Sequence, residues 1–321
     1  MTDQYGRPID YMRLSITDRC NLRCTYCMPQ GIQAAPRQEI LSFEEFLRIV
    51  RAAVTLGITH FKVTGGEPLV RKGAVPFIAR LKALPGVETV TLTTNGVLLA
   101  PLARQLADAG IDGVNISLDA ADRDGYRAIT GCDALEDVLA GLHACLALNI
   151  RTKVNCVLLS GSETQILPLA GLARRHPVDV RFIEVMPIGA GSSTSGVLQA
   201  RARAILAREW PDLHPVNEHR GFGPARYEAS RALRGRIGWI DAVSHGFCKS
   251  CNRVRITSTG LLKPCLCYGE GLDLRALLRA DGDARALACA MAGAIFQKPQ
   301  AHCFARLQQV SERHLMAQIG G

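Results

Sequence analysis

The sequence is poor in aromatic residues and lacks long apolar runs. Aromatic side chains make up only 5% of the 321 residues, whereas hydrophobic residues make up 48%, so we expect an aliphatic core. The longest uncharged run near the end, residues 286–296, is too short to cross a bilayer, because a membrane helix needs about 20 apolar residues. The first ten residues contain no apolar run, so no secretory signal is expected. The sequence therefore predicts a cytoplasmic protein with no membrane partner.

Runs of like charge are also absent. Lysine and arginine number 38 against 29 acidic residues, a formal net charge of +9. Such an excess favours an anionic partner, which would be a nucleic acid, a membrane surface or a phosphorylated small molecule. No run of five like charges occurs, so a basic tail is not expected. Scattered positive charge is equally compatible with an ordinary solvated surface.

Two groups of cysteines lack an obvious fourth member. The chain has 12 cysteines, which do not suggest a disulfide scaffold in the absence of a secretory signal. The two close groups are Cys20, Cys24 and Cys27, and Cys248, Cys251 and Cys265. Structural zinc takes four ligands. A [4Fe–4S] cluster also takes four thiolates, one for each iron, so three would leave one iron open to a small molecule. His245 or Cys267 could complete the second group, and zinc stays an alternative there.

The first two thirds of the chain alternate between predicted strands and helices. Strands are expected at residues 11–16, 58–63, 89–93, 114–118, 153–159 and 178–185. Helices are expected at residues 42–57, 75–84, 98–109 and 135–148, and again up to about residue 175. In the first helix, Ser42 and Glu45 form a capping-box pattern. This alternation predicts βαβ units and a parallel sheet, but repetition alone does not separate a barrel from an open sheet.

Polar, glycine- or proline-containing segments follow four of the predicted strands. They are Thr-Gly-Gly-Glu-Pro at 64–68, Thr-Thr-Asn-Gly at 93–96, Ser-Leu-Asp at 117–119 and Glu-Val-Met-Pro at 184–187. In a barrel or an open sheet, the carboxyl ends of parallel strands form the ligand site. After the sixth strand, residues 189–196 are expected to form a mobile loop. A helix is expected from Gln199 to Trp210, followed by irregular sequence.

These motifs resemble a known family. The C-x3-C-x2-C spacing, joined by Gly-Gly-Glu-Pro after the second strand, is similar to the radical S-adenosylmethionine (SAM) enzymes. Seven segments spread over residues 11–321 resemble, more closely, the GTP 3′,8-cyclases of molybdenum cofactor biosynthesis. They are RLSITDRCNLRCTYCMP, VTGGEPLVRKG, TTNG, NISLDA, FIEVMPIG, FCKSCNRVRIT and QIGG. The resemblance implies an α/β fold with an incomplete (β/α)6 TIM-like parallel barrel over residues 1–225. A C-terminal α+β region over residues 226–321 would carry a second iron–sulfur cluster and bind GTP.

The resemblance also implies a reaction. In this family, SAM bound at the first cluster is cleaved to a 5′-deoxyadenosyl radical, which removes the 3′ hydrogen of GTP. Bond formation from C3′ to C8 then gives (8S)-3′,8-cyclo-7,8-dihydroguanosine 5′-triphosphate, a lyase reaction. The implied cofactors are two [4Fe–4S] clusters and SAM. The implied partners are GTP, an external electron donor, the downstream cyclic pyranopterin monophosphate synthase and a second copy in a homodimer, with no nucleic acid.

The resemblance also implies roles for individual residues that match the family's motifs. The six grouped cysteines match the ligands of the two clusters. The SAM-binding positions are Tyr26, Gly66, Ser117 and Met186. The GTP-binding positions are Arg13, Lys62, Thr93, Lys153, Arg253, Val254 and Arg255, of which Arg253 and Arg255 would serve the cyclisation. Lys62 stands where the family often has arginine and keeps the charge without the planar fork. Cys267 is expected to be a bystander, and the tail from Ile319 to Gly321 resembles one that reaches into the active site.

Two alternatives compete with this interpretation. One is another two-cluster radical SAM enzyme that acts on a peptide. Such an enzyme usually carries more cysteines in its C-terminal region and needs a peptide groove. The other is a zinc-stabilised nucleic-acid-binding protein without catalysis, which accounts for the charge and the cysteines but not for Gly-Gly-Glu-Pro or the six βα units.

Overall fold

Six parallel strands run through the first part of the chain in sequence order. The computed structural model describes residues 1–280 and 283–320. The strands are β1 (Tyr11–Ser15), β2 (His60–Thr64), β3 (Thr89–Thr94), β4 (Gly113–Ser117), β5 (Thr152–Val157) and β6 (Asp179–Ile183). Each pairs in parallel with the next along the chain. The six strands expected from the sequence and their parallel arrangement are confirmed, with boundaries shifted by one or two residues.

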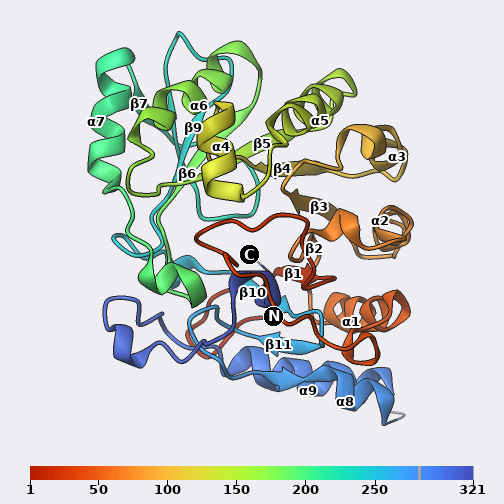
Figure 1. Ribbon diagram of the computed structural model, residues 1–321. Helices are drawn as coiled ribbons and strands as arrows, with labels where there is room; N and C mark the ends of the chain where they lie inside the picture. The colour runs from red at the N-terminus through yellow and green to blue at the C-terminus, as the bar shows by residue number, and fades with distance from the viewer. Residues whose placement is uncertain (281–282, 321) are drawn as a thin grey trace.

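Helices connect these strands and cover the outer face of the sheet (Figure 1). They are α1 (Phe43–Thr55), α2 (Ala74–Lys82), α3 (Ala103–Asp108), α4 (Arg123–Thr130), α5 (Leu135–Ala147) and α6 (Glu163–Arg175). Helix α1 begins with the predicted capping box, in which Ser42 Oγ accepts from Glu45 N at 3.0 Å and Ser42 N donates to the Glu45 carboxylate at 2.6 Å. The helix expected over 98–109 begins as a 3-10 turn, Ala100–Leu102, before α3, because Pro101 has no N–H to donate. Helix α4 was not predicted.

The C-terminal third supplies further strands at both edges of the sheet. They are β7 (His214–Val216), β8 (Arg226–Ala229), β9 (Ile237–Ile240), β10 (Arg253–Ile256), β11 (Leu261–Lys263) and β12 (Leu272–Asp273). Strand β9 pairs in parallel with β6, and β10 pairs in parallel with β1. The order is β12-β11-β10-β1-β2-β3-β4-β5-β6-β9-β8-β7. The expected helix from Gln199 to Trp210 is present as α7 (Gln199–Glu209). The expectation of irregular sequence after that helix was wrong, because these strands are too short for a clear periodic pattern.

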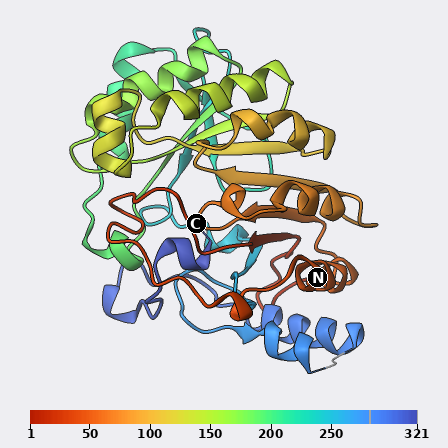
Figure 2. The same cartoon turned by 45° about the vertical axis from the view of Figure 1, so that its right-hand side comes forward.

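The fold is an open, barrel-like α/β sheet with additional helices from the second half. These are α7 (Gln199–Glu209), α8 (Leu274–Arg279), α9 (Ala284–Phe296) and α10 (Met316–Ile319). Helix α9 packs beside α1 (Figure 1), and the last described residues lie near the middle of the molecule in both views (Figures 1 and 2). No helix among the described residues is both long and apolar enough to span a bilayer.

The segment expected to be a mobile loop forms a short 3-10 helix, Gly189–Ser193. Gly191 is buried, and a Cβ added there would lie 2.3 Å from the Met186 carbonyl oxygen. Any larger residue would therefore push this segment away from the end of β6. The glycines of the segment permit close packing, whereas from the sequence they suggested an open linker.

Candidate active site

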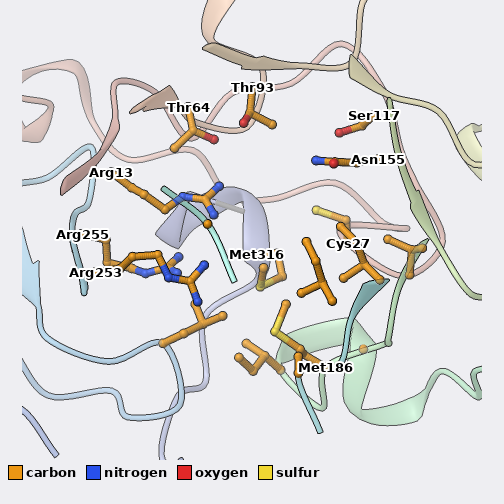
Figure 3. Close-up of a pocket in the computed structure, with 18 of the residues that line it drawn as sticks. Arg13, Cys27, Thr64, Thr93, Ser117, Asn155, Met186, Arg253, Arg255 and Met316 are labelled. Atoms are coloured by element: carbon orange, nitrogen blue, oxygen red, sulfur yellow. The ribbon is translucent and has the colours of Figure 1, made fainter. Parts of the chain in front are cut away.

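The predicted site residues surround one cavity at the carboxyl ends of the parallel strands. Its volume is about 330 Å³, and its wall includes all six grouped cysteines. Every position assigned from the sequence to SAM, GTP or a cluster lines this cavity except Lys153. Figure 3 shows Arg13, Arg253 and Arg255 gathered on one side, with Cys27 and Met186 on the other. The fold thus brings together motifs separated by more than 200 positions in the sequence.

The first cysteine group lies in the loop after β1. Two backbone hydrogen bonds attach the loop to the end of α4, from Arg23 N and Thr25 N to carbonyls of that helix, both at 2.9 Å. Burial raises the pKa of the Cys20 and Cys24 thiols, and it raises that of Cys27 to about 12. The neighbouring cysteines raise the pKa of Cys24 and Cys27 further, so their thiolates need a bound cation nearby.

The Gly-Gly-Glu-Pro segment packs against the cysteine loop. A Cβ added at Gly66 would lie 2.4 Å from the Arg19 carbonyl oxygen, so only glycine permits this approach. Glu67 is fully buried and accepts hydrogen bonds from Leu69 N, Thr94 Oγ1 and Asn95 N, at 2.9, 2.8 and 2.6 Å. These contacts join the ends of β2 and β3 and hold the segment rigid.

Tyr26 connects the cysteine loop to the end of β4. Its hydroxyl donates to Asp119 Oδ2 at 2.7 Å, and the other Asp119 oxygen accepts from Val157 N at 2.7 Å. Burial raises the pKa of Asp119 to about 6, against the opposing effect of these two hydrogen bonds. Ser117, at the end of β4, and Met186, after β6, complete the wall on this side.

The second cysteine group sits beside basic side chains. Cys248 opens a short 3-10 turn, and its Sγ accepts from His302 N at 3.4 Å. Burial alone would raise the pKa of Cys251, but the charges of Arg253 and Lys298 outweigh it and lower the pKa to about 7. A thiolate is therefore easier to form at Cys251 than in the first group, whereas burial raises the pKa of Cys248.

Buried cations line the part of the cavity nearest β1, β2 and β10. Arg13 stands opposite both Lys62 on β2 and Arg255 on β10. Burial lowers the pKa of Arg13 to about 10 and of Arg255 to about 9, and it lowers that of Lys62 well below its usual value. Like charges nearby lower all three further. Such a cluster favours a polyanionic ligand.

Lys153 faces an adjoining cavity of about 90 Å³. Its ammonium donates to the Arg220 carbonyl and to Tyr227 Oη, the latter at 3.0 Å, and it lies 3.6 Å from Asp179. Lys62 and Arg181 line both cavities, so the two form neighbouring parts of one basic region. The prediction of a triphosphate contact at Lys153 stays a prediction.

Several polar residues of the cavity wall were not assigned from the sequence, among them Arg181, Asn155 and Lys298. Arg181 on β6 donates through Nε to Asn155 Oδ1 at 2.9 Å, and Lys298 follows α9. The signal for Arg181 was present, because it is a charged residue that alternates with the apolar Val180 and Phe182 in the predicted strand. Lys298 had no such signal, since it lies outside the repeated strand–helix pattern.

The donor set fits two iron–sulfur clusters. Each trio offers three thiols at the cavity wall, and Cys267 also lines the cavity near the second trio. No group of three or more metal-binding side chains converges on a single-ion position among residues 1–280 and 283–320. A cluster does not need such convergence, because each thiolate binds a different iron.

The candidates for a fourth ligand of the second group are engaged elsewhere. His245 is exposed, and its Nδ1 lies 3.0 Å from Ser244 Oγ. Cys267 Sγ lies 3.0 Å from Cys303 Sγ in a small buried apolar cluster. This geometry supports the interpretation of Cys267 as a bystander. Gly320 reaches the strand ends, where its carbonyl accepts from Arg255 at 2.8 Å, while Gly321 lies outside the described residues.

A parallel barrel with a three-cysteine loop after its first strand and Gly-Gly-Glu-Pro after its second defines the radical SAM class. The sequence matches the Radical SAM superfamily over residues 14–165 and Molybdenum Cofactor Synthesis C over residues 178–304. The fold resembles that of Streptococcus suis SuiB bound to S-adenosylmethionine, with a TM-score of 0.67, 13% identity, and coverage of 97% of this chain and 78% of that one.

The curated relatives narrow the class. The GTP 3′,8-cyclase of Heliobacterium modesticaldum is 42% identical, and that of Clostridium perfringens strain SM101 is 38% identical, each over 100% of both chains. That of Geobacter sulfurreducens is 43% identical over 100% of this chain and 99% of the relative. The chain belongs to the GTP 3′,8-cyclase family, whose cofactors are SAM and two [4Fe–4S] clusters.

Proposed function

We propose that this protein converts GTP to (8S)-3′,8-cyclo-7,8-dihydroguanosine 5′-triphosphate, an early step of molybdenum cofactor biosynthesis. The observation that carries the proposal is a single cavity with a cysteine trio at each of two places and a buried cationic group within it. Cys20, Cys24 and Cys27 would hold the first cluster, which with SAM would supply the radical chemistry needed at the 3′ position of GTP. Everything else in the reaction rests on binding, orientation and the exclusion of water.

Residues on the β2, β4 and β6 side would hold SAM. Gly66 lets the end of β2 lie against the cysteine loop at the cavity wall, and Tyr26, fixed by Asp119, would give one flat wall. Ser117 and Met186 would bound the ligand from the ends of β4 and β6. Because these groups are held by hydrogen bonds or packing before any ligand arrives, little ordering remains to be done on binding.

The cationic side would bind the triphosphate. Arg13, Lys62 and Arg255 present three positive groups from neighbouring strands at the same level. Lys153 would extend this set through the adjoining cavity, and Thr93 offers a hydroxyl. Guanidinium and ammonium groups bind phosphate oxygens through charge-assisted hydrogen bonds.

Arg253 and Arg255 would serve the cyclisation itself. They alternate on β10 and both reach the cavity, two and four positions after Cys251, while Val254 between them lines the wall. Arg253 lies over the Phe247 ring, 4.8 Å from its centroid, which limits its movement. A fixed cation at this point would orient the nucleotide and stabilise charge as C3′ approaches C8.

Further partners are part of the proposal. An external electron donor would reduce the first cluster, and a cyclic pyranopterin monophosphate synthase would take the product. We further propose a homodimer and a division of the chain near residue 225, between the barrel and the C-terminal cluster region.

Anaerobic incubation of the reconstituted protein with GTP, SAM and a reductant tests the function. Mass spectrometry should detect 5′-deoxyadenosine and the cyclised nucleotide in equal amounts. Replacement of GTP by a peptide should give no modified peptide. A modified peptide without any cyclised nucleotide would contradict the proposal.

A further inference from the structure

Arg7 is a buried charged residue outside the cavity wall. It is only 5% exposed, and its partner Asp3 is 3% exposed. Arg7 Nε donates to Asp3 Oδ2 at 2.6 Å, and Arg7 N donates to Asp3 Oδ1 at 3.0 Å. A buried ion pair loses much hydration, and this loss is offset only if the remaining donors are also satisfied. The groups that accept hydrogen bonds from the remaining guanidinium donors therefore indicate which segments Arg7 holds together.

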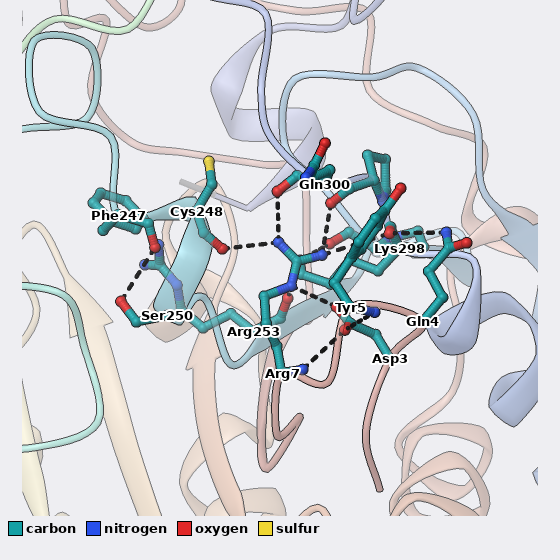
Figure 4. Close-up of polar contacts among 12 residues, drawn as sticks. Asp3, Gln4, Tyr5, Arg7, Phe247, Cys248, Ser250, Arg253, Lys298 and Gln300 are labelled. Carbon is teal, nitrogen blue, oxygen red and sulfur yellow. Dashed lines mark hydrogen bonds and ion pairs between the residues drawn. The ribbon is translucent and has the colours of Figure 1, made fainter.

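The four remaining N–H groups of the Arg7 guanidinium, on Nη1 and Nη2, all donate to backbone carbonyls. Nη1 donates to Cys248 O and Gln300 O, each at 2.8 Å. Nη2 donates to Pro299 O at 2.7 Å and, at 3.5 Å, to Lys298 O. Figure 4 shows this fan of contacts around the guanidinium. Arg7 therefore joins three consecutive carbonyls after α9 to the backbone of a predicted cluster ligand.

The segment that Arg7 holds reaches the other ligand-bearing segments. Lys298 is 2% exposed, and its ammonium donates to Arg253 O at 2.8 Å and to Pro264 O. Arg253 lies two positions after Cys251, and Pro264 directly precedes Cys265. His302 N, at the end of the same segment, donates to Cys248 Sγ. Residues 298–302 thus contact the surroundings of all three thiols.

We propose that Arg7 is a positioning residue for the second iron–sulfur cluster. It fixes the turn at Cys248 against residues 298–302, which in turn fix the backbone beside Cys251 and Cys265. The three thiols are thereby held in an arrangement that would retain the cluster at the cavity wall. This inference rests on the assignment of these three cysteines in the proposed function.

Lysine cannot replace arginine in this role. A guanidinium has five N–H donors in a planar fork, whereas an ammonium has three, and Arg7 uses all five. Residues that orient metal ligands from outside the coordination shell typically change metal affinity by about 10- to 100-fold when they are replaced. We therefore expect Arg7→Lys to release iron from the second cluster about 10-fold faster or more.

Two single-cluster forms of the full chain test this. One carries Cys20→Ser, Cys24→Ser and Cys27→Ser and should keep only the second cluster. The other carries Cys248→Ser, Cys251→Ser and Cys265→Ser and should keep only the first. Arg7→Lys is introduced into each, with the exposed Arg123→Lys as a matched control. The readouts are anaerobic iron release to a chelator and the electron paramagnetic resonance spectrum of the reduced cluster with and without GTP.

Arg7→Lys should speed iron release and alter the GTP response only where the second cluster is present, and Arg123→Lys should do neither. Asp3→Asn keeps the four carbonyl contacts and should give a smaller change in the same direction, which preserves the test if Arg7→Lys does not fold. Equal effects in both forms, or none in either, would overturn the inference. If the first form bound no iron even with Arg7 intact, the ligand assignment would fail and this inference with it.

Discussion

Arg13 and Arg255 occupy paired positions on β1 and β10, two parallel neighbours that are 242 residues apart in sequence. Burial lowers the pKa of both guanidinium groups, the charge of Arg253 lowers it further, and Arg13 adds to the effect on Arg255. Without an anion, this pairing of like charges away from water is unfavourable. The negative charge of a bound triphosphate would offset the repulsion between the two guanidinium groups. The unfavourable pairing in the unliganded site therefore favours binding of an anion.

Arg255→Met should weaken the binding of inorganic triphosphate and GTP by about 10- to 100-fold, because a hydrogen bond to a charged group contributes roughly 1.5–3 kcal/mol. The shift in melting temperature that triphosphate produces in the native protein should shrink accordingly. Arg80→Met, at an exposed ion pair on α2, is the matched control. An unchanged shift in Arg255→Met would show that Arg255 does not contact the phosphates.

Arg253→Ala should keep the iron of both clusters, because Lys298 donates to the Arg253 carbonyl rather than to its side chain, and the Lys298 charge still lowers the pKa of Cys251 after Arg253 is removed. Cyclised product should fall by on the order of 100-fold, as when one preorganised charge-stabilising group is removed. Iron content and mass detection of both products measure these effects together. Normal cyclisation would remove the catalytic assignment of Arg253.

Cys24→Ser should abolish SAM cleavage, because a serine hydroxyl is not ionised at neutral pH and is a poor ligand for iron. Iron content should fall by the amount of the first cluster, and 5′-deoxyadenosine should be undetectable. Cys145→Ser changes a buried cysteine of α5 that faces the core, and it should leave SAM cleavage intact. Retained cleavage in Cys24→Ser would contradict the ligand assignment.

Triphosphate binding should take up a proton at Lys153. Burial and the nearby charge of Arg181 lower the pKa of Lys153 to about 7, although the carboxylate of Asp179 opposes this shift. The amine is therefore largely neutral at pH 8. A bound anion favours the ammonium form, so GTP affinity should fall as pH rises from 7 to 9. Calorimetry of GTP binding in buffers of different ionisation enthalpy measures the uptake.

Lys153→Met should reduce that proton uptake, whereas Lys82→Met, at a partly exposed pair with Asp112, should not. Equal proton uptake in native protein and Lys153→Met would contradict the role of Lys153.

The lowered pKa of Lys153 also predicts how the stability of the unliganded fold depends on pH. Between pH 7 and the ordinary lysine pKa near 10.4, the unfolded chain binds more protons at this position than the folded chain, so the free energy of unfolding rises with pH.

Local sequence patterns determined much of this protein. The apolar strands, the Ser42–Glu45 capping box and the glycine-rich strand ends each depend on neighbours within a few positions, and all of them were recognisable. The two cysteine spacings are also local, and with the polar strand ends they pointed to the site. Because parallel strands converge at their carboxyl ends, a sequence that alternates strands and helices already places those motifs together.

Only the tertiary structure decided how the C-terminal third joins the barrel. Strands β9 and β10 have four residues each, and their places beside β6 and β1 depend on pairing with strands far away in the chain. The same holds for the contact of Arg7 with Cys248 and for the position of Lys153 in the adjoining cavity. Such contacts leave no periodic trace, because they are fixed by the packing of segments that meet only after the sheet has formed.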